Sequence, residues 1–129
     1  MQFKRHYTVA QARALLPQVR QSLTELNRLR RQIARDEERL AQRLAFGDDL
    51  GGPMVNDHLR HLAHLQRVLA WFSAREILIK DPDRGLIDFP ALRGGREIFL
   101  CWEQDEDDIE YWHELDTGFA GREKLPEEG

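Results

Sequence analysis

The chain's only cysteine and one of its five histidines lie close together in the segment LCWEQDEDDIEYWHEL (residues 100–115). Cys101 and His113 are residue types that can act as a nucleophile with its base, or as two ligands of a transition metal. Two β-strands would have to bring them together. REIFLCWE (residues 96–103) and DIEYWHEL (residues 108–115) are both typical of strands, and the acidic segment QDED joins them.

The alternation of side chains along these strands predicts whether the two residues meet. The apolar faces that match best consist of Ile98, Leu100 and Trp102 on the first strand and of Ile109, Tyr111 and His113 on the second. In that register Cys101 lies on the face opposite to His113. A one-residue slip would bring Cys101 and His113 together but would split the apolar set. A β-bulge could also bring them together. We therefore predict a buried, inert thiol, a hydrogen-bonded His113, and no bound transition metal or other cofactor.

Other polar residues could form a site around the expected edge of the sheet. The candidates for ligand binding carry carboxylate or guanidinium groups: Asp81, Asp83, Asp88 and Arg122. The candidates for acid–base catalysis are titratable residues of the same region: His113, Asp88 and Glu114. We favour turn formation and surface ion pairs as the explanation of these residues over a shared site. The chain has no P-loop, dinucleotide-binding fingerprint, GxSxG or HExxH motif.

A second possible metal site involves three histidines spaced three residues apart, at positions 58, 61 and 64. In a helix, His58 and His61 lie about one turn apart, and Glu37 is expected opposite them on a neighbouring helix. One carboxylate and two histidines could hold a metal ion between the helices. We favour the alternatives, which are a polar pairing that sets the register of the helices or plain amphipathic packing.

The longest predicted element is a helix from Thr8 to about Ala45. Thr8 and Gln11 have the spacing of a capping box. The following apolar residues recur at alternating steps of three and four, with breaks at Arg30 and Glu37: Leu16, Val19, Leu23, Leu26, Ile33, Leu40 and Leu44. This spacing is a heptad pattern. Pro17 should bend the helix near its start.

The remaining elements complete an α+β domain. GDDLGGP (residues 47–53) ends the first helix, and a second one is predicted from about Met54 to Ala74, antiparallel to the first. Residues 76–80 and 86–89 are two further strands, which gives a four-stranded antiparallel β-meander. We predict one domain, with a helical hairpin at residues 8–74, a β-layer at 76–115 and a tail at 116–129.

Composition and charge bear on location and partners. One cysteine fits a reducing compartment, and no signal peptide or apolar run of membrane-spanning length is present, so we predict a cytoplasmic protein. Residues 1–46 contain ten Lys/Arg and four Asp/Glu, against nine and nineteen in residues 47–129. A basic stripe on the first helix comprises Arg13, Arg20, Arg28, Arg31, Arg35 and Arg39. Because no aromatic residues interleave with it, we interpret the stripe as a solvated face rather than an RNA-binding surface.

The chain resembles a family of uncharacterised bacterial proteins. KDPDRGLIDFPALRGGREIFLCWE, YWHELDTGFAGRE and the opening TVAQARALLPQVR are similar to the domain-of-unknown-function 2203 family. The resemblance implies no activity and transfers no catalytic residue. It marks family-like positions, which could equally define the fold: Asp83, Gly85, Asp88, Phe89, Pro90, Cys101, Trp102, Trp112, His113, Gly118, Gly121 and Arg122.

Three functions remain open at this point. The long apolar seam favours a non-enzymatic interaction module that forms a homo-oligomer, preferably a dimer, through its helices. The alternative is a small enzyme or a ligand- or metal-binding protein with a site in the β-layer. RNA binding by the arginine stripe is the third.

Overall fold

The computed structural model describes residues 1–47 and 52–126. A helical hairpin, α1 and α2, is followed by a five-stranded antiparallel sheet with strand order β1-β2-β3-β4-β5. The elements are α1 (Val9–Ala45), α2 (Pro53–Ala74), β1 (Leu78–Asp81), β2 (Leu86–Arg93), β3 (Arg96–Trp102), β4 (Tyr111–Glu114), the 3-10 helix η1 (Phe119–Gly121) and β5 (Glu123–Lys124). The predicted hairpin and meander are confirmed. The sheet has one short strand more than expected, and β2 continues through Pro90 to Arg93.

The start of α1 is fixed both by its cap and by the sheet. Thr8 Oγ1 accepts a hydrogen bond from the Gln11 N–H, and the Gln11 side chain accepts one from the Thr8 N–H, which confirms the capping box. Just before it, the Tyr7 N–H donates to the carbonyl of Pro90 on β2 at 2.7 Å. The helix continues through Pro17 to Ala45. The predicted turn of residues 47–53 lies partly outside the described residues.

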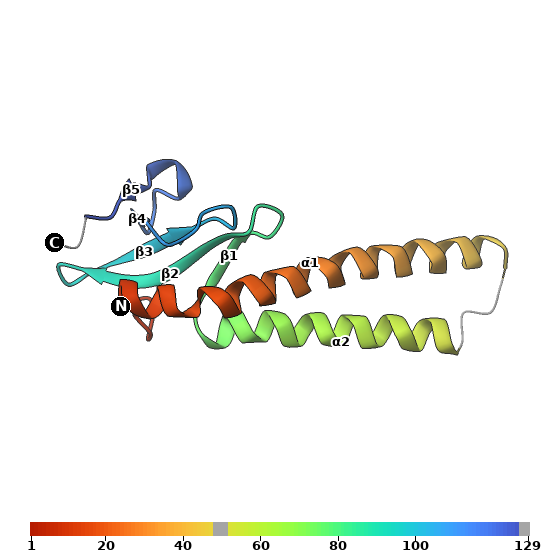
Figure 1. The fold of residues 1–129 in the computed structure, drawn as a ribbon. Helices are drawn as coiled ribbons and strands as arrows, with labels where there is room; N and C mark the ends of the chain where they lie inside the picture. The colour runs from red at the N-terminus through yellow and green to blue at the C-terminus, as the bar shows by residue number, and fades with distance from the viewer. Residues whose placement is uncertain (48–51, 127–129) are drawn as a thin grey trace.

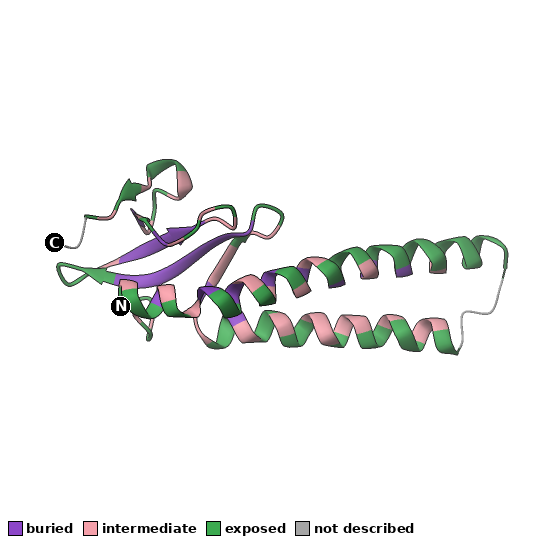
Figure 2. Cartoon of the chain, viewed as in Figure 1, coloured by how far each residue is buried: buried purple, intermediate pink, exposed green. Residues whose placement is uncertain are grey.

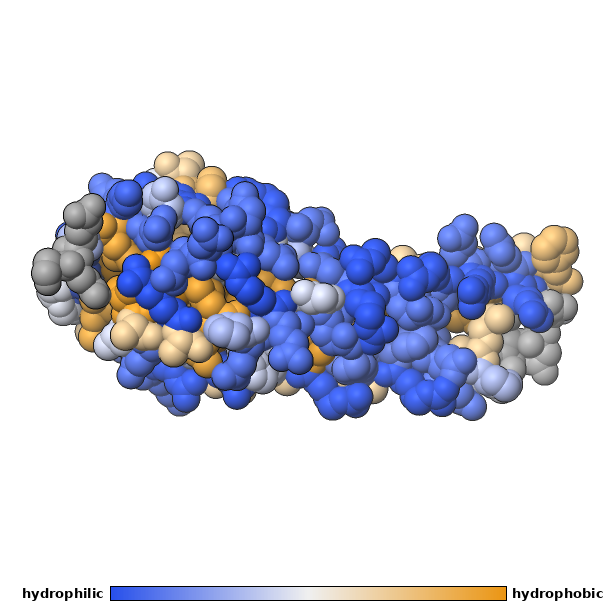
Figure 3. Space-filling model, in the orientation of Figure 1, coloured by the Kyte–Doolittle hydropathy of each residue, from blue (hydrophilic) through white to orange (hydrophobic). Residues whose placement is uncertain are grey.

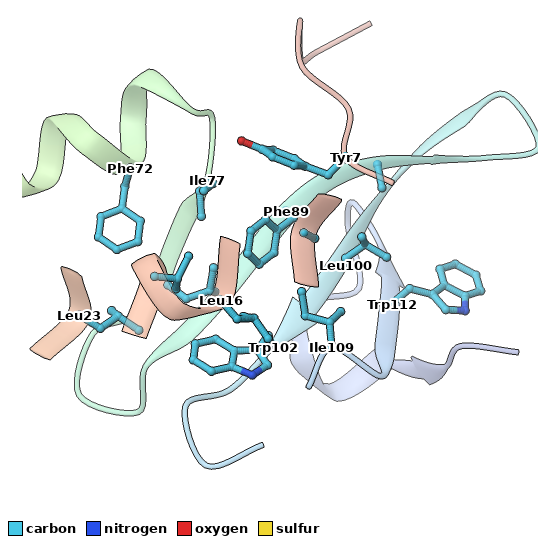
Figure 4. Close-up of a cluster of buried hydrophobic side chains, with 14 of the residues drawn as sticks. Tyr7, Leu16, Leu23, Phe72, Ile77, Phe89, Leu100, Trp102, Ile109 and Trp112 are labelled. Atoms are coloured by element: carbon cyan, nitrogen blue, oxygen red, sulfur yellow. The ribbon is translucent and has the colours of Figure 1, made fainter. Parts of the chain in front are cut away.

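The core lies between the first half of α1, the end of α2 and one face of the sheet (Figure 2). In Figure 4 the side chains of Leu16, Phe89 and Trp102 gather between helix and sheet. Phe89 and Trp102 are fully buried. Beyond this core the hairpin projects away from the sheet (Figure 1). Burial of aromatic side chains supplies much of the stability of such a small core.

The buried stripe of α1 drifts away from the predicted heptad. Leu16, Val19, Leu23, Leu26 and Ile33 are buried as expected, but the next buried positions are Leu29 and Asp36 rather than Arg30 and Glu37. A straight α-helix has 3.6 residues per turn, so its inner face shifts by one position relative to a 3.5-residue repeat over a few turns. By Leu44, which is 62% exposed, the stripe has reached solvent.

The second helix is much less covered than the first. Phe72 is the only buried residue of α2, whereas Leu59 and Leu69 are 56% and 38% exposed. In the view of Figure 3 the projecting hairpin is largely hydrophilic, and apolar surface is visible around the sheet. Within the described part of the chain, neither helix is apolar over the length that crossing a membrane requires.

Candidate functional site

The pairing of β3 with β4 places Cys101 and His113 on the same face of the sheet. Phe99 pairs with His113, Leu100 with Trp112, and Cys101 with Tyr111. Residues paired directly across an antiparallel ladder share a face. The prediction that Cys101 and His113 lie on opposite faces is therefore wrong, and so is the basis for predicting that the protein binds no metal.

The error in register has a physical cause. The predicted alternation runs from Ile109 to His113, but β4 begins only at Tyr111. Ile109 lies in the irregular segment before the strand and reaches the core from there. Trp112 then packs on the core face beside Leu100, and Tyr111 and His113 point to the outer face. The large indole thus occupies the core position that the period-two pattern assigned to its neighbours.

Asp88 completes a group of three side chains on this outer face. It pairs directly with Cys101 in the β2–β3 ladder. One oxygen, one sulfur and one ring nitrogen of Asp88, Cys101 and His113 all lie within 4.8 Å of one another. The three residues are at most 2% exposed although they face away from the helices. Three adjacent strands thus each contribute one polar side chain to a single buried cluster.

The hydrogen bonds of His113 fix the protonation of its ring. Nδ1 lies 2.6 Å from the carbonyl oxygen of Glu114, which can only accept, so we infer that Nδ1 carries a proton. Nε2 lies 3.0 Å from both carboxylate oxygens of Asp88. A second proton must therefore lie between Nε2 and the carboxylate. If a cation replaced that proton, Nε2 would present its lone pair while Nδ1 stayed hydrogen-bonded, as is usual for histidine ligands of metals.

Burial favours the protonated forms of the other two groups, the Asp88 carboxyl and the Cys101 thiol. Desolvation raises the pKa of Asp88, and the nearby His113 opposes this effect. Desolvation, followed by the charge of Asp88, raises the pKa of the Cys101 thiol to about 12. A thiol of that pKa is not a nucleophile at neutral pH, because the thiolate is the reactive form. The cluster is therefore unsuited to nucleophilic catalysis, whereas a dication would stabilise both anions.

Side chains from both ends of the chain cover the cluster. The rings of Phe3 and Phe99 stack edge to face at 5.4 Å, and the Phe99 ring lies equally close to that of His113. On the other side, the Arg122 guanidinium lies 3.7 Å from the centre of the Tyr111 ring and also pairs with Glu106. These contacts explain how residues on the outer face of a sheet can be buried.

Most of the other predicted site residues do not join this cluster. Asp81 accepts hydrogen bonds from the N–H groups of Asp83 and Arg84, which is turn chemistry. The ion pairs of the remaining candidates join Asp83 to Arg30, Glu114 to Arg96, and Arg122 to Glu106. Of the residues predicted around the edge of the sheet, Asp88 and His113 meet in this cluster, and the sequence analysis missed Cys101 as their partner.

His58 and His61 of α2 face Asp36 instead of Glu37, whereas His64 pairs with Glu25. Oδ2 of Asp36 lies 2.6 Å from Nδ1 of His61 and 3.2 Å from Nδ1 of His58, and Glu37 is exposed. These contacts lower the pKa of Asp36 to about 2, against the opposing effect of its desolvation. The arrangement satisfies the predicted polar pairing between helices, with the carboxylate displaced by one position because of the drift of the α1 stripe.

Part of the arginine stripe has a structural role. The guanidinium of Arg13 donates to the carbonyl of Ile109, and that of Arg20 donates to the carbonyls of Gln104 and Glu106. The two arginines thereby hold the irregular segment before β4 against α1. Arg28 pairs with Glu25 on its own helix.

Comparison with known proteins assigns the chain to a family without a known activity. The family described as "Uncharacterized conserved protein (DUF2203)" matches residues 5–125, so the chain belongs to it. No curated protein and no solved structure matches the chain.

Proposed function

We propose that this member of the DUF2203 family is a metal-binding protein in which Asp88, Cys101 and His113 ligate one transition-metal ion. The observation that carries the proposal is the convergence of these three side chains, from three adjacent strands, within 4.8 Å of one another. In a tetrahedral site with bonds of about 2.0–2.3 Å, ligand atoms are about 3.3–3.6 Å apart. Small shifts would therefore suffice to enclose an ion.

The types of the three ligands favour zinc. Thiolate and imidazole bind borderline metals such as Zn²⁺, whereas Ca²⁺ and Mg²⁺ prefer oxygen ligands alone. The Nδ1–H bond to the Glu114 carbonyl orients the imidazole from behind. Because all three ligands are at most 2% exposed, a structural role fits better than catalysis, which needs access for a substrate. Such an ion would tie β2, β3 and β4 together.

The test is metal content measured together with affinity. The purified chain is stripped with a chelator, reloaded with Zn²⁺ and analysed for metal by mass spectrometry, and affinity is obtained by competition with a chromophoric chelator. We expect about one zinc per chain, lost in Cys101→Ala and in Asp88→Asn. His64→Ala is the matched control, because His64 lies on α2 away from the cluster. Folded protein that binds no zinc, or variants that retain it, would refute the proposal.

Self-association is the second candidate function, and the sparse coverage of α2 favours it. Leu69, Phe72, Ile77 and Ile79 line a groove of about 390 Å³ between α2 and β1. β1 is an edge strand of the sheet and is available for pairing. In contrast, the α1 seam on which the sequence prediction rested is occupied within the chain, since Leu26 and Ile33 are buried there.

A second copy of the chain is the partner that this surface would take. We expect sedimentation equilibrium at tens of micromolar to show a dimer, and Leu59→Glu with Leu69→Glu to yield a folded monomer. Leu92→Glu is the control, because Leu92 is also exposed but lies at the far end of β2. A wild-type monomer at that concentration would exclude this function.

A further inference from the structure

A cavity of about 420 Å³ lies on the helix-facing side of the sheet, beyond the part that the hairpin covers. Its floor is apolar and consists of Ala91, Ile98, Leu100 and Leu125. The start of α1 and the segment around β5 form its walls, and apolar surface is visible beside the start of α1 in Figure 3. A volume of about 300–1,000 Å³ is usual for sites that bind small molecules.

The rim of this cavity is predominantly cationic. Arg13, Arg93 and Lys124 line it, against one acidic residue, Glu110. Arg13 has Asp108 as its acidic partner, but in the described part of the chain Arg93 and Lys124 have no carboxylate within ion-pair distance. Arg93 instead stacks on the Trp112 ring, 4.6 Å from its centre. Among the described residues, these two cations beside an apolar cavity thus have no carboxylate partner.

The first turn of α1 adds to the positive potential at the same rim. Thr8 and Val9 line the cavity, and no acidic residue lies in the first turn. The N–H groups of a first helical turn have no partner within the helix, and the helix dipole makes this end positive. The Tyr7–Pro90 hydrogen bond ties this end of the helix to β2.

We propose that the cavity binds an amphipathic organic anion, a carboxylate with an unbranched apolar tail, whose head group meets Arg93 and Lys124. The tail would lie on the floor of Ala91, Ile98 and Leu100. This site lies on the face of the sheet opposite to the Asp88–Cys101–His113 cluster, and it is independent of metal binding there.

Calorimetry with octanoate as the probe tests this proposal. Binding should be one to one, and each methylene from hexanoate to octanoate should tighten it about threefold to fourfold. Octanol has the same tail without the charge and should bind at least tenfold more weakly. Octylamine should not bind. Equal affinity for octanoate and octanol would overturn the proposal, because it would indicate apolar adsorption only.

Two variants separate the site from general binding. Arg93→Gln combined with Lys124→Gln changes only exposed side chains, so the fold should persist, and octanoate affinity should fall at least tenfold. Arg96→Gln is the matched control, because Arg96 is exposed and pairs with Glu114 instead. Cys101→Ser should leave octanoate binding unchanged. The proposal fails if the double variant binds octanoate as wild type does, or if raising the protein concentration displaces octanoate, since a second copy would then fill the cavity.

Discussion

Replacing Cys101 by serine should destabilise the protein far more when zinc is present than when it is absent. Serine supplies a hydroxyl that can donate to Asp88 in place of the thiol, so the hydrogen bonding of the cluster should survive. Cys101 is fully buried, and placing a more polar hydroxyl in its position should cost about 1–2 kcal/mol. That loss is expected in metal-free protein and does not depend on the proposed function.

Zinc should add a second and larger contribution to the stability of the wild type, but not to that of the variant. An ion that binds only the folded state at 100 times its dissociation constant stabilises it by about 2.7 kcal/mol. Serine is a poor zinc ligand, so Cys101→Ser should lose this gain in addition. The difference in free energy of unfolding between wild type and variant should therefore rise to about 4 kcal/mol under saturating zinc.

Urea denaturation followed by circular dichroism measures these differences, with the chelated protein and the zinc-loaded protein compared for each variant. Thermal denaturation gives a second readout. For a chain of this size, a change of about 1 kcal/mol in the free energy of unfolding shifts Tm by about 3–5 °C, so zinc should raise the wild-type Tm by about 10 °C. His61→Ala serves as the control for zinc bound at the hairpin histidines. If zinc stabilises Cys101→Ser as much as wild type, the ion binds elsewhere and the assignment of the cluster is wrong.

Two further predictions concern single residues. Native Cys101 should react with a thiol reagent much more slowly than free cysteine, because it is buried and its pKa is raised to about 12; labelling as fast as in urea would contradict this. Asp36→Asn should cost about 1–2 kcal/mol at pH 7, after allowance for screening by solvent. Because its folded pKa of about 2 lies below the unfolded value, this contribution should decrease as the pH falls from 5 through 2, and the urea midpoints of the two proteins should approach each other over that range.

The helical part of the fold was predictable because its signals are local. Thr8 and Gln11 form a capping box whose hydrogen bonds join each side chain to the backbone N–H of the other residue. Over the short distance from Leu16 to Leu26, the apolar spacing fits a repeat of 3.5 residues and a repeat of 3.6 residues equally well. Further along, the same pattern fails by one position, at Asp36 for Glu37. A repeat of 3.5 and a repeat of 3.6 residues become distinguishable only after several turns.

The outer-face cluster could not be predicted in the same way, because it depends on pairing between strands. The β3–β4 register rests on where β4 begins, and residues 103–110 follow no period that the sequence displays. The Arg20 side chain holds part of that segment by donating to the backbone carbonyls of Gln104 and Glu106. Because every residue has a backbone carbonyl, the sequence of the segment gives no sign of this interaction. A sign was nevertheless present, since Trp112 is the largest apolar side chain of residues 108–115 and alternation from it places His113 outside.

The register that buries Trp112 is also the register that assembles the cluster. Shifting β4 by one residue against β3 would turn Trp112 out of the core and bring His113 into it, away from Cys101. Packing of Trp112 beside Leu100 on one face and the hydrogen bonds of His113 on the other therefore select the same pairing. Because apolar packing and these hydrogen bonds both favour this register, the three polar side chains can converge before any ion is present. A metal ion would then find its ligands already positioned, with no strand left to reorganise.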